Sequence, residues 1–361
     1  MGEKVVKLGV VGLGRGMSVT RDILRETRVR VTAICDRNPS EMAEALKILD
    51  EYQYGEVATY AEFDDMIVDA DVDAVYIATD AIYHVPYVIR CLDAGKHVIS
   101  EIPAVNSVEE ARQLKAAVKS HPELKYMTGE NCFYWAFIQM WKQMHDEGKL
   151  GETIYAESEY IHGHDWREVK PDSYDKNHWR YFNPAIKYLT HNLGPLLYIM
   201  DDYCVSVSCM TPDVIYNPYR PLQKNGVALF KTAKGAVIRI LITFDSYTYF
   251  DHNFRIIGTR GSVETDMTKQ LDDAHTFARL SDIPESRKDK IDIPVTLKFE
   301  GDDESGHGGA DKKMMMAFID CILNDTEPPI DVDMGIRMAI PGIIAHESSL
   351  QGGAVMEIPQ I

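Results

Sequence analysis

The sequence predicts an α/β protein with two domains: a doubly wound parallel sheet at the N-terminus, then an α+β domain with a mostly antiparallel sheet. Three observations support this fold class. Short apolar runs alternate with helix-like segments over residues 1–128, as in the crossover units of parallel sheets. A glycine-rich turn follows the first apolar run. From residue 129 onward, apolar and polar positions alternate as in antiparallel strands with one buried face.

The expected elements follow in chain order. In the first domain, residues 1–128, strands are expected at 5–11, 29–35, 74–78 and 97–100, and helices at 42–49, 83–92 and 108–118. In the second domain, residues 129–361, helices are expected at 133–146, 311–323 and 333–350, and strands at 153–161, 226–232, 236–244 and 254–257. Residues 271–301 are charged and weakly patterned, so a flexible excursion is expected there.

Composition excludes several classes of function. The 361 residues contain 38 Lys and Arg against 56 Asp and Glu, a net charge of −18, which opposes nucleic-acid and anionic membrane partners. No apolar run approaches the ~20 residues of a membrane span, and the N-terminus has no signal-peptide pattern. The six cysteines form no Cys-x-x-Cys pair, so neither a disulfide framework nor a zinc site is indicated. A cytoplasmic protein is expected.

The motif Gly12-Leu13-Gly14-Arg15-Gly16-Met17 follows the first expected strand. In a dinucleotide fold, such glycines permit a tight turn and a close backbone approach, and the following helix N-terminus receives the pyrophosphate. Met17 stands where a third glycine is usual. Asp36, 22 residues beyond Gly14, would bond the adenosine ribose and favour NAD. Arg37 keeps NADP open, and Asp36 has a plainer reading as a turn residue.

Two further segments carry a family resemblance: Ala78-Thr79-Asp80-Ala81-Ile82-Tyr83-His84 and Ala94-Gly95-Lys96-His97-Val98-Ile99-Ser100-Glu101-Ile102-Pro103. With them the whole chain resembles the glucose–fructose oxidoreductase/inositol dehydrogenase/MocA (Gfo/Idh/MocA) superfamily. The resemblance implies a dinucleotide-binding Rossmann domain, oxidation of a sugar or cyclitol hydroxyl, and a homo-oligomer. It adds Thr79, His84, Glu101 and Pro103 as candidate cofactor contacts.

The second half resembles one branch of that superfamily. The motifs are Glu130-Asn131-Cys132-Phe133-Tyr134, Tyr160-Ile161-His162, Trp179-Arg180, Thr190-His191-Asn192-Leu193-Gly194-Pro195 and Gly306-His307-Gly308-Gly309-Ala310-Asp311. They are similar to the NAD-dependent glycosidases typified by α-N-acetylgalactosaminidases, whose relatives oxidise glycosides to 3-keto products. The resemblance implies catalytic roles for Glu130, His162, His191 and Tyr188. It implies substrate contacts at Asn131, Tyr134, Trp179, Arg180, Asn192 and His307.

Each candidate also has a structural reading. Glu130 would suit the N-terminus of the following helix, the histidines would serve as buried structural residues, and Tyr188 would be core. The family's usual Glu-Lys-Pro reads Glu101-Ile102-Pro103 here, so the usual lysine is absent. His162-Gly163-His164-Asp165 resembles a metal cluster, but no third ligand follows at regular spacing, and no metal is predicted.

Three hypotheses follow. The leading one is an NAD-dependent oxidoreductase that converts the C3 hydroxyl of a sugar or glycoside to a ketone, with His191 as base. The second is a glycosidase that continues from this ketone through elimination, water addition and return of the hydride. The third is a catalytically inactive sugar or dinucleotide sensor, which Ile102 in place of lysine favours.

Overall fold

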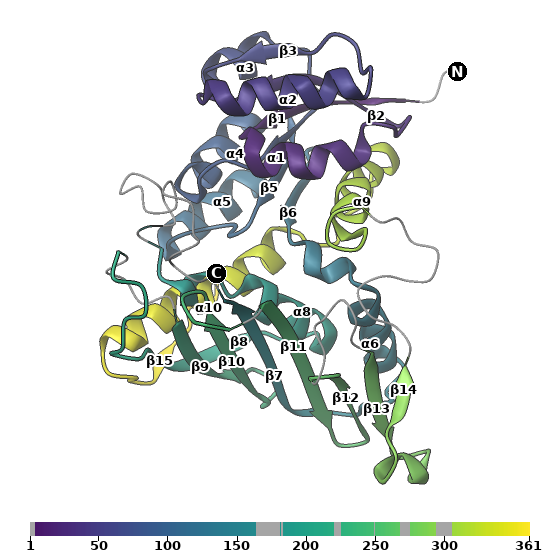
Figure 1. Ribbon diagram of the computed structural model, residues 1–361, viewed down its shortest axis with the longest axis vertical. Coiled ribbons are helices and arrows are strands. Elements are labelled where there is room, and N and C mark those ends of the chain that lie inside the picture. Colours follow the sequence, from purple (N-terminus) through teal and green to yellow (C-terminus); the bar gives the residue numbers. More distant parts are fainter. Residues whose placement is uncertain are drawn as a thin grey trace. The chain divides into compact units, whose positions relative to one another are not determined.

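The computed structural model describes residues 4–163, 181, 183–219, 225–248, 250–267, 275–293 and 305–361. The chain forms two compact units, and Figure 1 labels most of their helices and strands. The first unit consists of Met1–Asn131 and Asp303–Ile336, and the second of Cys132–Asp302 and Arg337–Ile361. The sequence predicts one boundary, between residues 128 and 129. The structure differs, because residues 303–336 pack with the N-terminal segment.

The first unit is built on a six-stranded parallel sheet with the order β3-β2-β1-β4-β5-β6. Its strands are β1 (Val6–Val11), β2 (Val29–Cys35), β3 (Ala58–Tyr60), β4 (Ala74–Ile77), β5 (His97–Glu101) and β6 (Tyr126–Gly129). The direction of strand order reverses between β1 and β4, the position at which doubly wound sheets bind ligands beyond their carboxyl ends. β4 is wholly buried, as expected of a parallel sheet covered on both faces.

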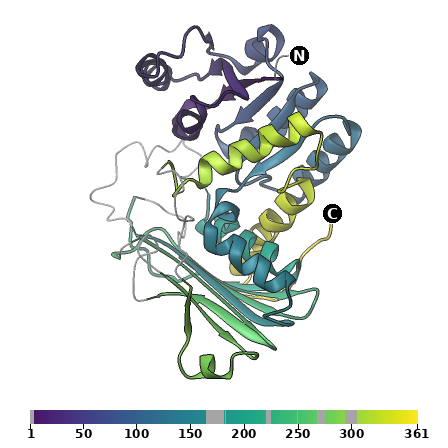
Figure 2. The same cartoon turned by 90° about the vertical axis from the view of Figure 1, so that its right-hand side faces the viewer.

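Among its described residues, the first unit has five α-helices between its strands and a sixth from the C-terminal half of the chain. They are α1 (Leu13–Thr20), α2 (Pro39–Glu51), α3 (Phe63–Asp69), α4 (His84–Asp93), α5 (Val108–Ser120) and, from the C-terminal half of the chain, α9 (Ala310–Asn324). The sequence explains where two of them begin. Asn38 accepts from Ser40 N at 2.9 Å before α2, and Ser107 accepts from Glu110 N at 3.1 Å before α5. α9, yellow-green in Figure 2, contacts α1, β1 and β6.

The second unit is built on a nine-stranded sheet with the order β14-β13-β12-β11-β7-β10-β9-β8-β15. Every pairing is antiparallel except that of β10 with β7. The strands are β7 (Thr153–His162), β8 (Cys204–Met210), β9 (Asn225–Thr232), β10 (Val237–Thr243), β11 (Phe250–Gly258), β12 (Gly261–Thr265), β13 (Thr276–Leu280), β14 (Ile291–Ile293) and β15 (Met356–Glu357). The helices are α6 (Ala136–Asp146), α8 (Thr190–Met200) and α10 (Val332–Leu350), whose first turns belong to the first unit.

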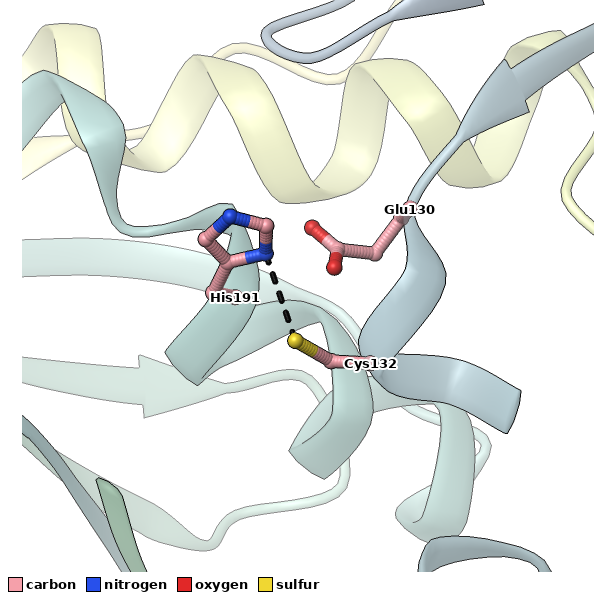
Figure 3. Close-up of side chains that lie close together, drawn as sticks. All are labelled: Glu130, Cys132 and His191. Atoms are coloured by element: carbon pink, nitrogen blue, oxygen red, sulfur yellow. Dashed lines mark hydrogen bonds between the residues drawn. The ribbon is translucent and has the colours of Figure 1, made fainter. Parts of the chain in front are cut away.

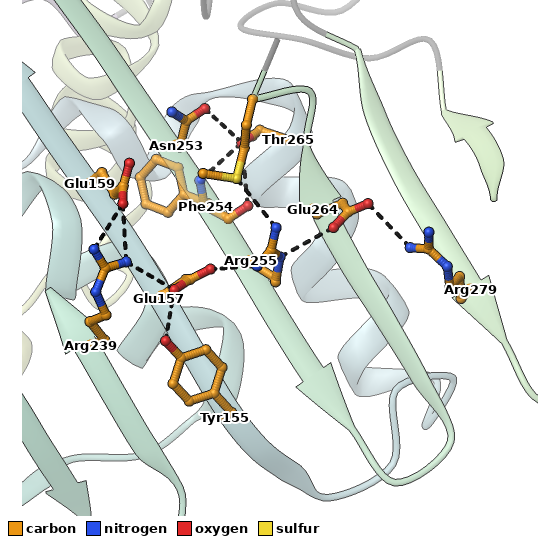
Figure 4. Close-up of polar contacts among 11 residues, drawn as sticks. Tyr155, Glu157, Glu159, Arg239, Asn253, Phe254, Arg255, Glu264, Thr265 and Arg279 are labelled. Atoms are coloured by element: carbon orange, nitrogen blue, oxygen red, sulfur yellow. Dashed lines mark hydrogen bonds and ion pairs between the residues drawn. The ribbon is translucent and has the colours of Figure 1, made fainter. Parts of the chain in front are cut away.

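The two faces of β7 have different chemistry, because successive side chains of a strand point to opposite faces. Ser158 accepts from Asn192 Nδ2 of α8 at 3.1 Å, so its face is turned toward that helix. The other face carries Glu157, which accepts from Arg239 of β10 at 3.0 Å and Arg255 of β11 at 2.7 Å (Figure 4). The helix-facing side of β7 therefore positions the candidate site, and the opposite side is charged.

One expectation about this unit is wrong. Residues 275–293, expected to belong to a flexible excursion, form β13, a 3-10 turn at Pro284–Arg287 and β14. The charges that suggested an excursion are cross-strand partners: Arg279 of β13 donates to Glu264 of β12 at 3.2 Å.

Among the described residues, no helix combines the length and the apolar character that crossing a membrane requires.

Candidate active site

The glycine-rich turn of the first unit has the geometry of a dinucleotide site. Gly12 has φ +85°, and a Cβ there would lie 2.6 Å from backbone atoms of Ala78 and Thr79, so only glycine fits. A Cβ on Gly16 would lie 2.9 Å from Val10 Cγ1, so this glycine lets α1 pack against β1. No side chain of the described residues caps α1, and its first turn holds no acidic residue. The backbone N–H groups of this turn and the helix dipole therefore fit the pyrophosphate of NAD.

Asp36 has the structural role in a turn that the sequence suggested, and its contact with the adenosine ribose stays a prediction. Its Oδ2 accepts from Leu13 N at 2.7 Å and its Oδ1 from Asn38 N at 2.8 Å. The carboxylate thus joins the glycine-rich turn to the start of α2. Each carboxylate oxygen has a second lone pair, which is chemically suited to a ribose hydroxyl. Arg37 is paired with Glu62 at 2.7 Å, so its charge is already opposed by a carboxylate.

Arg15 lies in the first turn of α1, but its guanidinium is held by carboxylates. Nε donates to Glu101 Oε1 at 3.0 Å, and the two terminal nitrogens donate to Asp311 at 2.9 and 2.8 Å. Tyr76 also donates to Glu101, at 2.6 Å. Burial, with the charge of Glu101, keeps the pKa of Tyr76 well above its usual value. The expected cofactor contacts Arg15 and Glu101 therefore pair with each other rather than presenting two separate charges.

The side chain of His84 contacts backbone carbonyl groups. It is 1% exposed, and its Nδ1 and Nε2 lie 3.0 Å from the carbonyl oxygens of Pro103 and Thr79, respectively. These contacts connect the segment after β4 to the segment after β5. We therefore assign His84 a structural role. Thr79 and Pro103, which were also expected near the cofactor, contact the His84 ring through their backbone carbonyl oxygens. Met17 is buried at 2% exposure in α1.

In the second unit, His191 lies at the start of α8 among aromatic side chains. The centroids of the Tyr160 and Tyr188 rings lie 5.6 and 5.4 Å from that of His191, both in edge-on geometry. Its Nδ1 lies 3.3 Å from Cys132 Sγ (Figure 3). Tyr160 comes from the helix-facing side of β7, and Tyr188 from the 3-10 turn Ala185–Tyr188. The structure therefore brings together His191 and Tyr188, and adds Tyr160 and Cys132.

His252 of β11 is a site residue that sequence reasoning missed. Pro195 stands four residues after His191 and has no N–H, so the helix leaves the His191 carbonyl without its usual donor. His252, 1% exposed, makes a hydrogen bond to the His191 backbone. Burial, with His191 and His162 nearby, holds the pKa of His252 well below its usual range. A neutral His252 thus supports the first turn of α8, and the spacing of His191 and Pro195 was the available signal.

His162 belongs to the same aromatic group. Its ring centroid lies 5.8 Å from that of Tyr160 and 5.2 Å from that of Phe250 of β11. Tyr160 in turn lies 4.7 Å from His252. The second unit thus gathers three imidazoles and two phenols, groups that exchange protons. His164 and Asp165, which completed the metal-like sequence, lie outside the described residues.

The remaining candidates lie in several places. Glu130, drawn in Figure 3, is fully buried directly after β6, and α6 begins only at Ala136, so Glu130 does not cap that helix. Asn131 and His307 both bond to Asp311 in the first unit, at 2.8 and 2.9 Å. Asn192 is buried and bonds to Ser158, which indicates a structural role. Tyr134 ends the 3-10 turn that Asn131 begins. Trp179 and Arg180 lie outside the described residues.

Family models match most of the chain. Residues 6–129 match the oxidoreductase family with an NAD-binding Rossmann fold, Gfo/Idh/MocA. Residues 138–264 match the C-terminal domain of the same family. The chain belongs to the Gfo/Idh/MocA family. Residues 225–361 also match the C-terminal domain of glycosyl hydrolase 109. The family and branch read from the sequence motifs are confirmed, as is NAD as the cofactor of this oxidoreductase.

Named relatives agree. A glycosyl hydrolase family 109 protein of Solibacter usitatus is 27% identical, covering 98% of this chain and 87% of the relative. Glycosyl hydrolase family 109 protein 2 of Shewanella sp. (strain ANA-3) is 28% identical, and the match covers 88% of this chain and 77% of the relative. Levoglucosan dehydrogenase in complex with NADH and levoglucosan has a TM-score of 0.83 at 18% identity, covering 99% and 100%. Scyllo-inositol dehydrogenase of Lactobacillus casei has a TM-score of 0.80 at 20% sequence identity, and the match covers 98% of this chain and 99% of that structure. These structures confirm the two-part fold.

Proposed function

We propose that this oxidoreductase removes hydride from C3 of a sugar or glycoside and produces a 3-keto sugar. The observation that carries the proposal is the placement of His191 among Tyr160, Tyr188 and Cys132, in a family whose first domain binds NAD. Oxidation of an alcohol requires a base near the hydroxyl and a hydride acceptor near the carbon. Bound NAD supplies the hydride acceptor.

His191 takes the hydroxyl proton in this scheme. Its Nδ1 faces Cys132 Sγ, so Nε2 is the nitrogen assigned to the substrate. An imidazole exchanges protons readily near neutral pH. The phenol edges around the ring restrict its orientation, which keeps the lone pair in line with the hydroxyl. Ile102 is apolar and 4% exposed, so proton handling falls to groups such as His191.

The second candidate function is redox-neutral glycoside hydrolysis. The match of residues 225–361 to the glycosyl hydrolase 109 C-terminal domain favours it. A ketone at C3 acidifies the C2 hydrogen, and a second base would remove that proton while the C1–O bond breaks and the aglycone leaves. Water then adds across the C1–C2 double bond, and hydride returns to C3. Glu130 and His162 are the residues we assign as candidates for the second base.

A panel of aryl glycosides, including α-N-acetylgalactosaminides and C2-deuterated substrates, distinguishes the hypotheses. Oxidation alone gives a 3-keto glycoside that keeps its deuterium, with NADH or a reduced artificial acceptor in equal amount. Hydrolysis gives free aglycone and loss of C2 deuterium with no build-up of NADH. We expect the first result. A chain that binds NAD and sugar but forms neither product is a sensor, and the proposal is then wrong.

The proposal includes a homo-oligomer, as the family resemblance implies. The charged face of the second sheet carries Arg239 and Arg255 paired with carboxylates (Figure 4). Val227 and Leu229 are 39% and 50% exposed on β9, the neighbour of β10. Light scattering after size-exclusion chromatography should show more than one chain per particle, and a monomer at all concentrations contradicts this part.

A further inference from the structure

Asp311, at the start of α9, is a buried carboxylate that joins separate segments of the first unit. Its side chain is 1% exposed. Oδ1 accepts from Arg15 Nη2 and Asn131 Nδ2, both at 2.8 Å. Oδ2 accepts from Arg15 Nη1 and His307 Nδ1, both at 2.9 Å. Because each oxygen has two donors, the position of the carboxylate is fixed from both sides, and charge-assisted bonds of this kind are strong.

The donors of Asp311 lie at functionally different places in the chain. Arg15 is the third residue of α1, one residue beyond Gly14, and so belongs to the turn that would receive the pyrophosphate. Asn131 directly follows Glu130, the buried carboxyl beyond β6. Asp311 is 296 residues from Arg15 and 180 from Asn131. It therefore connects the cofactor turn to the Glu130–Asn131 segment through side chains that local sequence does not link.

The surroundings of Asp311 keep this connection stiff. Gly306 N donates to Asp22, beyond α1, at 2.9 Å, and a Cβ on Gly306 would lie 2.5 Å from Asp311 Oδ2. Burial alone would raise the pKa of Asp311, but hydrogen bonds from His307 and Arg15 hold it well below its usual range. The carboxylate is therefore ionised and fully bonded at neutral pH.

We propose that Asp311 is a positioning residue that transmits occupancy of the cofactor turn to Glu130 and Asn131. Phosphate groups on the N–H groups of α1 restrict the first turn of that helix, which contains Arg15. The bidentate Arg15–Asp311 pair passes this restriction to Asn131, whose backbone carries Glu130. NAD binding then orders the carboxyl before the sugar arrives. The catalytic meaning of Glu130 rests on the proposed function, but the linkage itself does not.

Hydrogen–deuterium exchange with NAD as the only ligand tests the linkage. In the wild-type chain, NAD should slow amide exchange at residues 12–17 and also at 129–134, the latter by about fivefold or more, as expected of a coupled pair of sites. In Asp311→Ala, Arg15 and Asn131 both lose the acceptor that they share, so slowing should persist at 12–17 and disappear at 129–134. The matched control is Asp320→Ala, at a surface residue of the same helix α9 that pairs with Arg28, and it should behave as wild type.

Two results would overturn the proposal. One is that NAD slows amide exchange at residues 129–134 equally in the wild-type chain and in Asp311→Ala. The other is that, in the wild-type chain, NAD slows amide exchange at residues 12–17 only. If Asp311→Ala does not fold, Asn131→Ala removes only the far end of the connection and is judged by the same two criteria. No sugar is needed, so a chain that binds NAD but oxidises no glycoside contradicts the proposed function and leaves this inference intact.

Discussion

At the scale of single residues, the imidazole of His191 is the group on which the proposed chemistry depends. We expect His191→Ala to lower kcat by ~10²–10⁴, the usual cost of losing a general base. NAD affinity should stay within a few-fold of wild type, since His191 belongs to the second unit. Steady-state kinetics and calorimetry measure the two quantities. His275→Gln, at an exposed histidine paired with Asp292, is the control. A His191→Ala enzyme with near-normal kcat would remove this residue from the mechanism.

The pairing of His252 with the His191 carbonyl gives a second prediction. His252→Phe keeps a ring but removes the donor, leaving a carbonyl that Pro195 prevents the helix from satisfying. We expect a loss of about 1–3 kcal/mol in the free energy of unfolding, the usual cost of an unsatisfied buried group, and a lower kcat with little change in KM.

Pro195→Ala provides the matching test, because an N–H at position 195 lies four residues after His191 and bonds its carbonyl within the helix. The double variant His252→Phe/Pro195→Ala should therefore recover part of the stability and of kcat that His252→Phe loses. Additive losses in the double variant would show that His252 acts in some other way.

Local signals explain which site residues the sequence revealed. His191 and His162 stand in motifs, and Tyr188 lies three residues before His191, whereas His252 stands alone in a strand. The prediction of Arg15 as a cofactor contact did not include its carboxylate partners, because Asp311 is 296 residues away and no local pattern shows such a pair. The sequence predicts His84 as a cofactor contact for a similar reason: the two carbonyl oxygens that its ring contacts belong to different loops, which no local pattern shows.

At the scale of elements, the segment after β2, which Asp36 joins to the turn between β1 and α1, carries the preference between NAD and NADP. We expect NAD to bind tightly and NADP poorly, because a 2′-phosphate would face the Asp36 carboxylate while Arg37 is paired with Glu62. Asp36→Asn removes the charge but keeps an oxygen for one backbone N–H, so it should narrow the gap in affinity. Calorimetry on cofactor-free protein measures both constants. Asp71→Ala, at an exposed partner of Lys7, should leave the gap unchanged, and equal affinities in wild type would contradict the assignment.

Elements with a clear pattern could be predicted, and those without one could not. The expected strands of residues 29–35 and 97–100 correspond to β2 and to β5, which is one residue longer. α8 was not anticipated, since nine of its eleven residues are buried and a helix that is apolar all round shows no 3.6-residue stripe. The three-residue strands β3 and β14 are too short to show alternation.

At the scale of the whole molecule, buried histidines make stability depend on pH. Burial lowers the pKa values of His97, His252 and His346. The unfolded chain therefore binds more protons than the folded chain below about pH 6.5. The stabilisation of the folded chain that these neutral histidines give is complete above about pH 6.5 and is lost as the pH falls. For the fully buried His252, the free energy of unfolding should fall by about 1.4 kcal/mol for each pH unit below about pH 6.5. Urea unfolding between pH 5 and 7.5 measures it, and His252→Phe should flatten it. A slope unchanged in that variant would contradict the assignment.

The discontinuous first unit has a consequence for how the chain is made. Synthesis delivers residues 1–131 first, but α9 and Asp311 follow only after the segment that forms most of the second unit. Until they leave the ribosome, β6 lacks its contacts with α9, and Arg15 lacks its bidentate partner. Residues 1–131 therefore lack these contacts while more than 170 further residues are synthesised. We expect a fragment of residues 1–131 to exchange its amides rapidly and to be digested by protease. Joining residues 303–336 to it through a flexible linker should restore a protected core.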